Sequence, residues 1–319
     1  MTLTPPKMSS VLDARRVIRD KLPRTPLYRW PVLCRRSGLE IFVKHENHLP
    51  IGAFKVRGGL YLMSKLSEEE RARGVITAST GNHGQSIAYG AHAYGVRAVI
   101  VLPEKANPAK VESMEALGAE LRFVGKDFDE AREYVERVSQ EEGLRLVHTA
   151  NEPDLIAGVG TFTLEMLEEV PDLDVIYVAL GGGSAAASAC LVTKTVAPHV
   201  RVVAVQSAQA PAAYRSWREG RLVEAEMSTF AEGVATRTAF ELTQSILRES
   251  LSDFVLVDDD EIRSAMRTYL ETTRNLVEAS GAVSLAGALH DAEKLQGQRV
   301  GVVLSGANAS IQQLSEVLD

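Results

Sequence analysis

The sequence predicts an α/β protein with two doubly wound lobes, each built on a parallel sheet. Short, β-branched apolar runs recur along the chain. The longer stretches between them have apolar residues three and four positions apart, which is the spacing of an amphipathic helix. The runs are apolar at successive positions, as expected for strands that helices cover on both faces. The length of 319 residues corresponds to about two domains of roughly 150 residues each.

The elements follow in chain order. The predicted strands cover residues 97–102, 120–124, 174–180, 200–205, 254–257 and 300–304. Ser67 opens the run Ser-Glu-Glu-Glu, a capping box that predicts the start of a helix. Another helix is predicted over 108–118, because a proline suits its first turn and Gly118 ends the pattern. We expect a smaller domain of residues 50–142 and a larger one of residues 1–49 together with 143–319. No Pro/Gly/Ser-rich linker separates them, so they should pack closely around a cleft.

The composition excludes several classes of protein. Apolar residues make up 45% of the chain and charged residues 24%, the ordinary mixture of a soluble globular protein. A net charge of −7 without a basic cluster argues against nucleic acid or an anionic membrane as the partner. Two distant cysteines, Cys34 and Cys190, exclude a disulfide scaffold and fit a reducing compartment. The N-terminus lacks the apolar core of a signal peptide and no apolar run is long enough to span a membrane, so we expect a cytoplasmic protein.

Four glycine-bearing segments lie where a strand or loop meets a helix: residues 46–59, 78–85, 180–185 and 304–308. In the third, Gly181, Gly182, Gly183 and Ser184 follow a predicted strand and precede a helix. Glycines let the backbone approach a ligand closely, and the N–H groups at a helix start can cradle an anion, so we predict a phosphate site. The alternative is a tight turn that binds nothing. Neither a Walker loop nor a GxGxxG fingerprint is present, which points to a smaller phosphorylated ligand.

Lys55 is the candidate nucleophile. It lies between Phe54 and Val56 in a glycine-rich segment, and Arg57 follows two residues later. The apolar neighbours and the second cation should both lower the pKa of Lys55 and make a free amine available for Schiff-base chemistry. The ordinary alternative is a lysine on a solvated helix face.

The other two segments carry hydroxyl and amide groups. The run Ser79, Thr80, Gly81, Asn82 and His83 precedes a helix expected to begin near Gln85. Hydroxyls, an amide and backbone N–H groups at a helix start suit a carboxylate, and the alternative is a simple helix cap. A lone histidine here is more often structural than a base. Ser305 follows the last predicted strand and would either reach into the cleft or cap a helix.

In this order and spacing, the four segments resemble the fold-type II pyridoxal-phosphate enzymes, the tryptophan-synthase β family. Within that family the similarity is greatest to the serine/threonine dehydratases and serine racemases. The similar stretches extend over nearly the whole chain and include KHENHLPIGAFKVRG, ASTGNHGQSIA, GGGS, EASGAVSLAGAL and LSGAN. So many ordered matches are far more specific than any one motif.

The resemblance implies a role for each candidate residue. Lys55 would bind pyridoxal 5′-phosphate covalently, and Phe54 would pack near its ring. The phosphate would lie in the loop of Gly181, Gly182, Gly183 and Ser184. Asn82 would hydrogen-bond the 3′-oxygen of the cofactor, and Ser305 would face the pyridine nitrogen. The Ser79–His83 loop would take the substrate carboxylate.

The implied activity is deamination of L-threonine or L-serine to 2-oxobutyrate or pyruvate and ammonia. A neutral serine at the pyridine nitrogen makes a weaker electron sink than a carboxylate would, which favours loss of the β-hydroxyl group. The alternatives are a serine racemase and a 3-hydroxyaspartate dehydratase. Thr80 stands where the racemases carry an acid/base serine, and its β-branching restricts its rotamers.

Further expectations concern partners and regulation. Residues 206–212 contain no acid where some relatives hold a cation, so no metal is expected. The chain ends shortly after LSGAN, so we expect no C-terminal regulatory domain and a catabolic enzyme. The resemblance also implies a homodimer whose only other partner is a small amino-acid substrate. A non-catalytic binding protein on the same fold is the remaining alternative, and Lys55 together with the phosphate loop argues against it.

Overall fold

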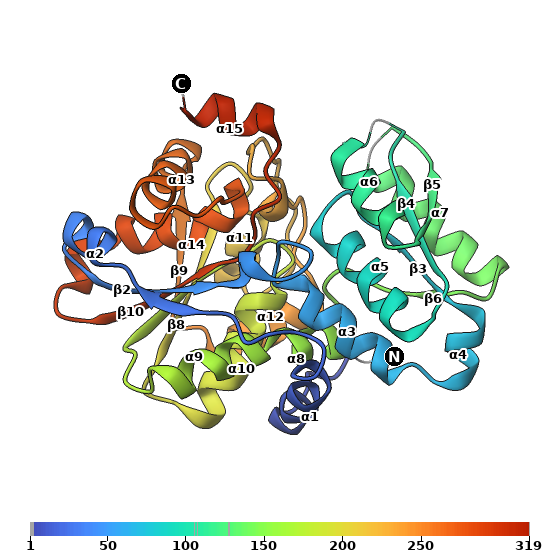
Figure 1. The fold of residues 1–319 in the computed structure, drawn as a ribbon, viewed down its shortest axis with the longest axis horizontal. Helices are drawn as coiled ribbons and strands as arrows, with labels where there is room; N and C mark the ends of the chain where they lie inside the picture. Colours follow the sequence, from blue (N-terminus) through green and yellow to red (C-terminus); the bar gives the residue numbers. More distant parts are fainter. Residues whose placement is uncertain (1–2, 105, 107, 127, 319) are drawn as a thin grey trace.

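A computed structural model describes residues 3–318 except 105, 107 and 127, and it contains two separate sheets (Figure 1). The larger sheet has the strand order β1-β2-β10-β7-β8-β9 and is parallel except for β1, which runs antiparallel to β2. Its strands are β1 Leu27–Arg29, β2 Glu40–His45, β7 Val175–Ala179, β8 Arg201–Ser207, β9 Asp253–Val257 and β10 Arg299–Leu304. The smaller sheet is wholly parallel, with the order β5-β4-β3-β6. Its strands are β3 Val75–Ala78, β4 Ala98–Leu102, β5 Glu120–Phe123 and β6 Arg145–Leu146.

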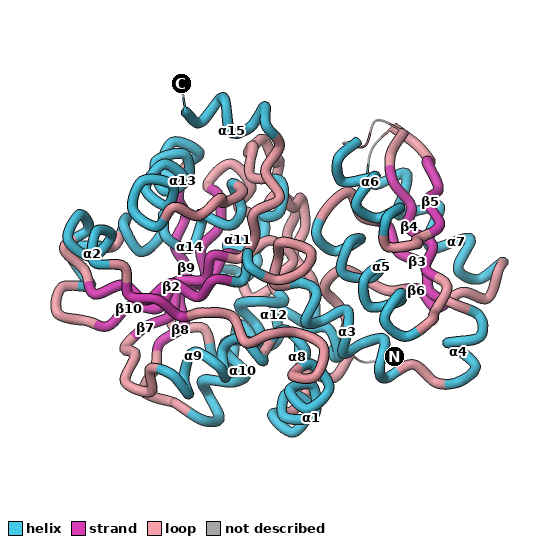
Figure 2. The backbone as a smooth tube through the Cα atoms, in the orientation of Figure 1, coloured by secondary structure: helices cyan, strands magenta, loops and turns pink. Residues whose placement is uncertain are grey.

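Helices lie on both sides of each sheet, as Figure 2 shows. The helices that precede β7 are α1 Met8–Ile18, α2 Pro31–Ser37, α3 Lys55–Lys65, α4 Glu68–Arg73, α5 Asn82–Tyr94, α6 Pro108–Ala116, α7 Phe128–Glu141, α8 Pro153–Val159 and α9 Thr161–Glu169. Those that follow it are α10 Ser184–Val196, α11 Ala212–Glu219, α12 Glu241–Ser250, α13 Asp259–Thr273, α14 Ala279–His290 and α15 Ile311–Leu318. Short 3₁₀ turns occupy Glu46–His48, Glu232–Val234 and Ala292–Leu295. Among the described residues, no helix is both long and apolar enough to cross a membrane.

Alternation along the strands divides the larger lobe into two apolar layers. On β7, Ile176 and Val178 face a core shared with α1, α8, α9, α10 and α12. Val175 and Tyr177 face the opposite core, shared with α2, α13 and α14. Successive side chains of a strand point to opposite faces, so a strand that is apolar at every position is buried on both. This confirms the α/β fold with covered parallel sheets.

Helix α3 packs closely against its neighbours because two glycines stand on it. A Cβ atom at Gly58 would lie 2.9 Å from the carbonyl oxygen of Leu155 in α8. A Cβ atom at Gly59 would lie 2.4 Å from the carbonyl oxygen of Ser86 in α5. Such approaches exclude any side chain at these two positions. The close packing fixes the start of α3, where Lys55 is the first helical residue.

Several sequence expectations need correction. Helix α5 begins at Asn82 instead of near Gln85. Strand β5 is an edge strand and is not buried on both faces, since Phe123 is 47% exposed. The short β6 belongs to the smaller sheet although it lies beyond residue 142, where we expected the smaller domain to end. The capping box at Ser67 is confirmed, with both reciprocal hydrogen bonds to Glu70 present.

Candidate active site

All the predicted site residues line a single cavity of about 480 Å³. They reach it from loops at the carboxyl ends of β3, β7 and β10 and from the segment before α3. Ligands of doubly wound sheets bind at this end of the strands, where helix N-termini point their free N–H groups. The predicted residues that line the cavity are Phe54, Lys55, Ser79, Thr80, Gly81, Asn82, His83, Gly181, Gly182, Gly183, Ser184 and Ser305. A cavity of this size suits a small cofactor together with a small substrate.

Lys55 sits in this cavity with its Nζ atom 4.9 Å from the centre of the Phe54 ring. Its pKa is lowered to about 8, because burial disfavours the charged ammonium, while the charge of Glu278 raises it. A lysine with this pKa has a sizeable fraction of neutral amine near neutral pH, as a nucleophile or base requires.

Arg57 does not contribute to this shift, contrary to the sequence expectation. Its side chain is fully buried and binds two carboxylates away from the cavity. Its Nε donates to Glu46 Oε2 at 2.7 Å, and its Nη1 donates to Glu165 Oε1 at 2.7 Å. Residues two apart on a helix do not face each other, and the paired guanidinium charge is neutralised where it lies. Burial, rather than a neighbouring cation, therefore lowers the pKa of Lys55.

The glycine loop after β7 fits a phosphate. A Cβ atom at Gly181 would lie 2.3 Å from the carbonyl oxygen of Gly233, and Gly183 has a φ of +91°. The loop leads directly into α10, which begins at Ser184. The first N–H groups of an α-helix have no partner within the helix, so they can donate to an anion. Since glycine has no side chain, the backbone of Gly181, Gly182 and Gly183 faces the cavity directly.

The lysine segment and the last loop are joined through their backbones. Phe54 N–H donates to the Ser305 carbonyl at 3.1 Å, and Ala307 N–H donates to the Gly52 carbonyl at 2.9 Å. The Ser305 hydroxyl itself lies 3.4 Å from the Ser280 carbonyl, which is a long and weak hydrogen bond. Ser305 is therefore placed in the cavity by its backbone, and its hydroxyl is available to a ligand.

Asn82 is held by two polar side chains. Its Nδ2 donates to Glu278 Oε1 at 2.7 Å, and its Oδ1 accepts from Asn308 Nδ2 at 2.7 Å. Because an amide nitrogen carries two hydrogens, one N–H remains for a ligand. Glu278 also accepts from Ser280 Oγ at 3.0 Å, and burial raises the pKa of its carboxyl group.

The Ser79–His83 loop is built around the Ser79 hydroxyl. Its oxygen accepts from the N–H groups of Gly81 at 3.2 Å and Gly84 at 2.9 Å, so it stabilises the turn into α5. His83 is buried with its Nε2 3.0 Å from Thr77 Oγ1. Because the Thr77 hydroxyl donates its hydrogen to the Val147 carbonyl, its oxygen accepts in the contact with His83, and His83 Nε2 carries the proton. Burial lowers the pKa of His83 to about 3, so the ring is neutral, as expected for a structural histidine.

Sequence reasoning gave no role to several polar residues that line the cavity. Glu278 and Asn308, described above, are two of them. Lys110 of α6 and Glu232 of the turn Glu232–Val234 are two more, and they form an ion pair with each other. A glutamate inside the apolar stretch LVEASGAVSLAG was a usable signal for Glu278, since buried carboxylates need partners. The Lys110–Glu232 pair had no such signal, because its members are 122 positions apart.

The fold and the cavity together define a cofactor-dependent α/β enzyme, and comparison with known proteins identifies the family. The model of the family described as "Pyridoxal-phosphate dependent enzyme" matches residues 18–306. The chain is 35% identical over 313 residues to an L-threonine ammonia-lyase of Thermotoga maritima, covering 98% of this chain and 78% of that protein. It is 34% identical over 314 residues to an L-threo-3-hydroxyaspartate ammonia-lyase of Saccharomyces cerevisiae, covering 98% and 96%.

A solved structure of maize serine racemase is also similar, with a TM-score of 0.93, 30% sequence identity, and coverage of 99% of this chain and 97% of that one. The chain therefore belongs to the pyridoxal-phosphate-dependent enzymes of fold type II, in the serine/threonine dehydratase group. Its cofactor is pyridoxal 5′-phosphate. The glycine loop and the amine of Lys55 in one cavity provide the anion cradle and the nucleophile that this cofactor requires.

Proposed function

We propose that this protein is a pyridoxal-phosphate-dependent ammonia-lyase that converts L-threonine and L-serine to 2-oxobutyrate and pyruvate, releasing ammonia. The observation that carries the proposal is the meeting of Lys55, the glycine loop and the Ser79–His83 loop in one cavity. The cavity provides an amine, an anion cradle and a second set of helix-start N–H groups, which match a cofactor aldehyde, a cofactor phosphate and a substrate carboxylate. Fold alone would not justify an activity, but these groups do.

We assign the cofactor contacts to the residues that the sequence predicted. Lys55 would bind the cofactor covalently, with Phe54 beside the ring. Gly181, Gly182, Gly183 and Ser184 would hold its phosphate, the remaining N–H of Asn82 its 3′-oxygen, and the Ser305 hydroxyl its ring nitrogen. When bound, the cofactor stabilises the electron pair left on the substrate Cα atom after deprotonation. The substrate carboxylate would bind the loop of Ser79, Thr80, Gly81, Asn82 and His83.

Lys55 is then the group that moves the proton. With a pKa near 8, its amine can accept the Cα proton near neutral pH and release that proton at a later step of the catalytic cycle. His83 is unsuited to this role, because its lowered pKa and its contact with Thr77 make it a weak base. Glu278 lies at the other side of Asn82 and holds that amide in place.

The charges in the cavity favour a neutral substrate side chain. Among the described residues that line it, the lysines are Lys55 and Lys110. Lys110 is already neutralised by Glu232, and Arg237 is exposed and lies outside the lining. A second substrate carboxylate would therefore face Glu232 without a free cation, which is unfavourable. This observation favours threonine and serine over 3-hydroxyaspartate.

Racemisation is the second candidate, favoured by one residue. Thr80 lines the cavity with Lys55, and an acid/base group on the opposite face of the substrate is what a racemase needs in addition to its lysine. We rank it below dehydration because the β-branched Thr80 has restricted rotamers. The variant Thr80→Ala would abolish racemisation and leave dehydration measurable.

The test uses the purified holoenzyme with L-threonine and L-serine. We expect the absorption band of the bound cofactor and formation of 2-oxobutyrate or pyruvate, with both lost in Lys55→Ala. A cofactor band without any 2-oxo acid would overturn the lyase assignment, and a growing D-serine fraction on chiral chromatography would replace it with a racemase. Absence of a cofactor band in the native protein would contradict the site itself.

We extend the proposal to the domain organisation, the cellular location and the oligomeric state of the protein. The two sheets support a smaller and a larger domain with the cavity between them, with the division placed after β6. The resemblance supports a catabolic, cytoplasmic homodimer, and light scattering on the purified holoenzyme tests the dimer by a molecular mass of twice 34.6 kDa.

A further inference from the structure

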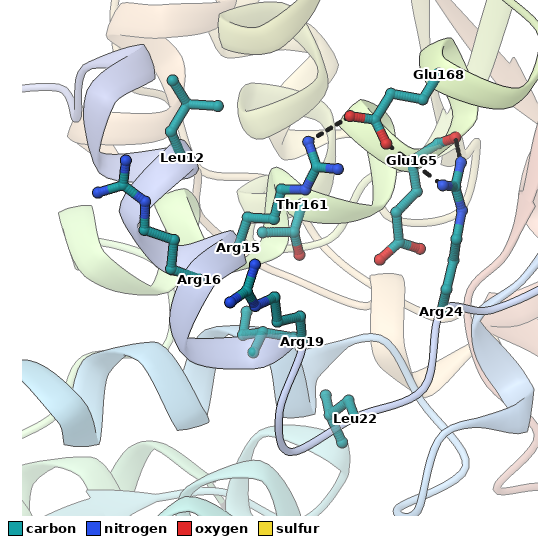
Figure 3. Close-up of a pocket in the computed structure, with 10 residues that line it drawn as sticks. Leu12, Arg15, Arg16, Arg19, Leu22, Arg24, Thr161, Glu165 and Glu168 are labelled. Carbon is teal, nitrogen blue, oxygen red and sulfur yellow. Dashed lines mark hydrogen bonds and ion pairs between the residues drawn. The ribbon is translucent and has the colours of Figure 1, made fainter.

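A second pocket of about 460 Å³ lies between α1 and α9, and the described residues that line it are all different from those of the active-site cavity. Figure 3 shows four arginines around it, Arg15, Arg16, Arg19 and Arg24. In the sequence these arginines lie within residues 15–24, where apolar residues, Asp20 and Lys21 stand between them. Folding α1 and the segment after it gathers them around one hollow.

The charges of this pocket are unbalanced on its inner surface. Two carboxylates line it, Glu165 and Glu168. Glu165 is already bound from beneath, by Arg57 Nη1 at 2.7 Å and by the buried Lys44 Nζ at 2.7 Å. Glu168 is the lining carboxylate left to oppose the arginines, and Glu169, which lies outside the lining, pairs with Arg24 Nη2 at 3.7 Å. Glu168 contacts both Arg15 and Arg24, the latter at 3.4 Å.

The remaining two arginines are weakly held. Among the residues that the structure describes, Arg19 forms its ion pair with its neighbour Asp20, at 3.4 Å and with both side chains more than 70% exposed. Arg16 is near the carboxylate of Asp13, which is itself bound by Tyr61 and Lys65, and within the described part of the chain no ion pair or hydrogen bond holds the Arg16 guanidinium. In Figure 3 neither guanidinium is joined to another of the lining residues that are drawn. Exposed pairs of this kind contribute little free energy, so these groups are available to a ligand.

Helix stability does not account for the arrangement. Basic residues in the last turn of a helix interact favourably with its dipole, which explains Arg15 and Arg16. It does not explain Arg24, which lies beyond the helix and donates from Nη2 to the Glu165 carbonyl at 2.6 Å. That contact holds the guanidinium against α9, beside Glu168 (Figure 3). Leu12, Ile18 and Leu22 add apolar surface to the lining, which also includes Thr161.

We propose that this pocket binds a small polyvalent anion that carries phosphate or carboxylate groups on a compact body. Guanidinium groups bind both kinds of oxyanion through paired hydrogen bonds. The volume is within the range of small-molecule sites, and an overall charge of −7 makes a local excess of arginine unusual in this chain. The anion would displace Glu168 from Arg15 and Arg24 and recruit Arg16 and Arg19.

Calorimetric titration of the holoenzyme tests the site without relying on activity. The probes are inorganic pyrophosphate and citrate at a fixed ionic strength of about 0.15 M, with bound cofactor occupying the phosphate loop. The variants are R16A/R19A and the matched control R215A/R218A, which removes the same charge from the exposed face of α11. A third variant, E168Q, removes the carboxylate that competes with the anion.

We expect one saturable site in the native protein and in R215A/R218A. The Kd should rise at least about tenfold in R16A/R19A and fall in E168Q. Preference for pyrophosphate would assign the site to phosphate esters, and preference for citrate would assign it to polycarboxylates. The proposal is overturned if neither probe saturates, or if both double variants weaken binding equally, which would indicate only a general effect of charge.

Discussion

Substitution of Gly181 by alanine tests the phosphate loop directly. The added Cβ atom would lie 2.3 Å from the Gly233 carbonyl oxygen and 3.0 Å from the Val234 Cα atom. Both are backbone atoms, so relief of the overlap requires the loop to move by roughly 1 Å, an overpacking that costs about 1–3 kcal/mol. A shift of that size misaligns the N–H groups of the loop. Loss of one or two hydrogen bonds to a charged phosphate, at about 1.5–3 kcal/mol each, weakens cofactor binding about 10- to 100-fold or more.

The measurement is the Kd of pyridoxal phosphate for the apoenzyme, by absorption titration, together with urea unfolding of the apoenzyme. Gly182→Ala is the matched control, since its Cβ atom would meet only side-chain atoms of Ala150 and Phe240, at 3.2 Å and beyond. We expect a clearly larger rise in Kd for Gly181→Ala than for Gly182→Ala. If Gly181→Ala binds the cofactor as tightly as the native protein, the loop is not the phosphate cradle and the reasoning fails.

Three other predictions follow from the charges of the cavity. The rate at which the apoenzyme recovers its cofactor band should increase with pH, with a midpoint at about pH 8, because only the neutral amine of Lys55 reacts. In Glu278→Gln this midpoint should fall, since the charge of Glu278 raises the pKa of Lys55. In Glu232→Gln, the ratio of kcat/KM for L-threo-3-hydroxyaspartate to kcat/KM for L-threonine should rise about tenfold, because Lys110 loses its partner and can bind the second carboxylate of the substrate. If this ratio stays high when Lys110→Met is added, the assignment to Lys110 is refuted. His83 has a folded pKa of about 3 against 6.5 unfolded, so its contribution to stability is present above pH 6.5 and is lost as pH falls toward 3. Urea unfolding of the native protein should show a loss of about 2 kcal/mol in the free energy of unfolding between pH 8 and pH 5. This loss should be absent in His83→Gln. If the native protein and His83→Gln have the same pH profile of stability, the pKa of His83 is not lowered in the folded protein.

The architecture was predictable because both sheets depend on local pattern. Runs of β-branched residues are buried on both faces, and the helices between them carry apolar stripes, so fold class followed from periodicity. Four observed strands were not predicted: β1, β2, β3 and β6. β1 and β6 have three and two residues, too few to show a period, and β6 is recognised as a strand only by its pairing with β3. β2 and β3 are short buried runs of six and four residues that were missed.

The lining of the candidate site was predictable where it consists of glycines and of residues next to them. Gly181 and Gly183 are required by close backbone approach and by a positive φ, and such requirements are visible in a sequence as glycine at a strand-to-helix turn. Glu278 is marked only by its place inside an apolar stretch, and Lys110 and Glu232 have no mark in the sequence. Their roles depend on which charges the fold places opposite one another, and that information is distributed over distant segments.

The wrong expectation about Arg57 shows how that distribution matters. Adjacent cations in sequence suggested electrostatic repulsion, yet Arg57 forms a buried cluster with Lys44 against Glu46 and Glu165, two charges of each sign. A buried charge must be paired, and breaking such a pair costs about 3–5 kcal/mol. The guanidinium is therefore fixed on the far side of α3, and the cluster holds that helix to β2 and α9. Lys55 is left as the amine that faces the cavity without a carboxylate in contact, so that burial governs its pKa. Two positions along α3 thus separate the cation that stabilises the fold from the amine that we propose as the nucleophile.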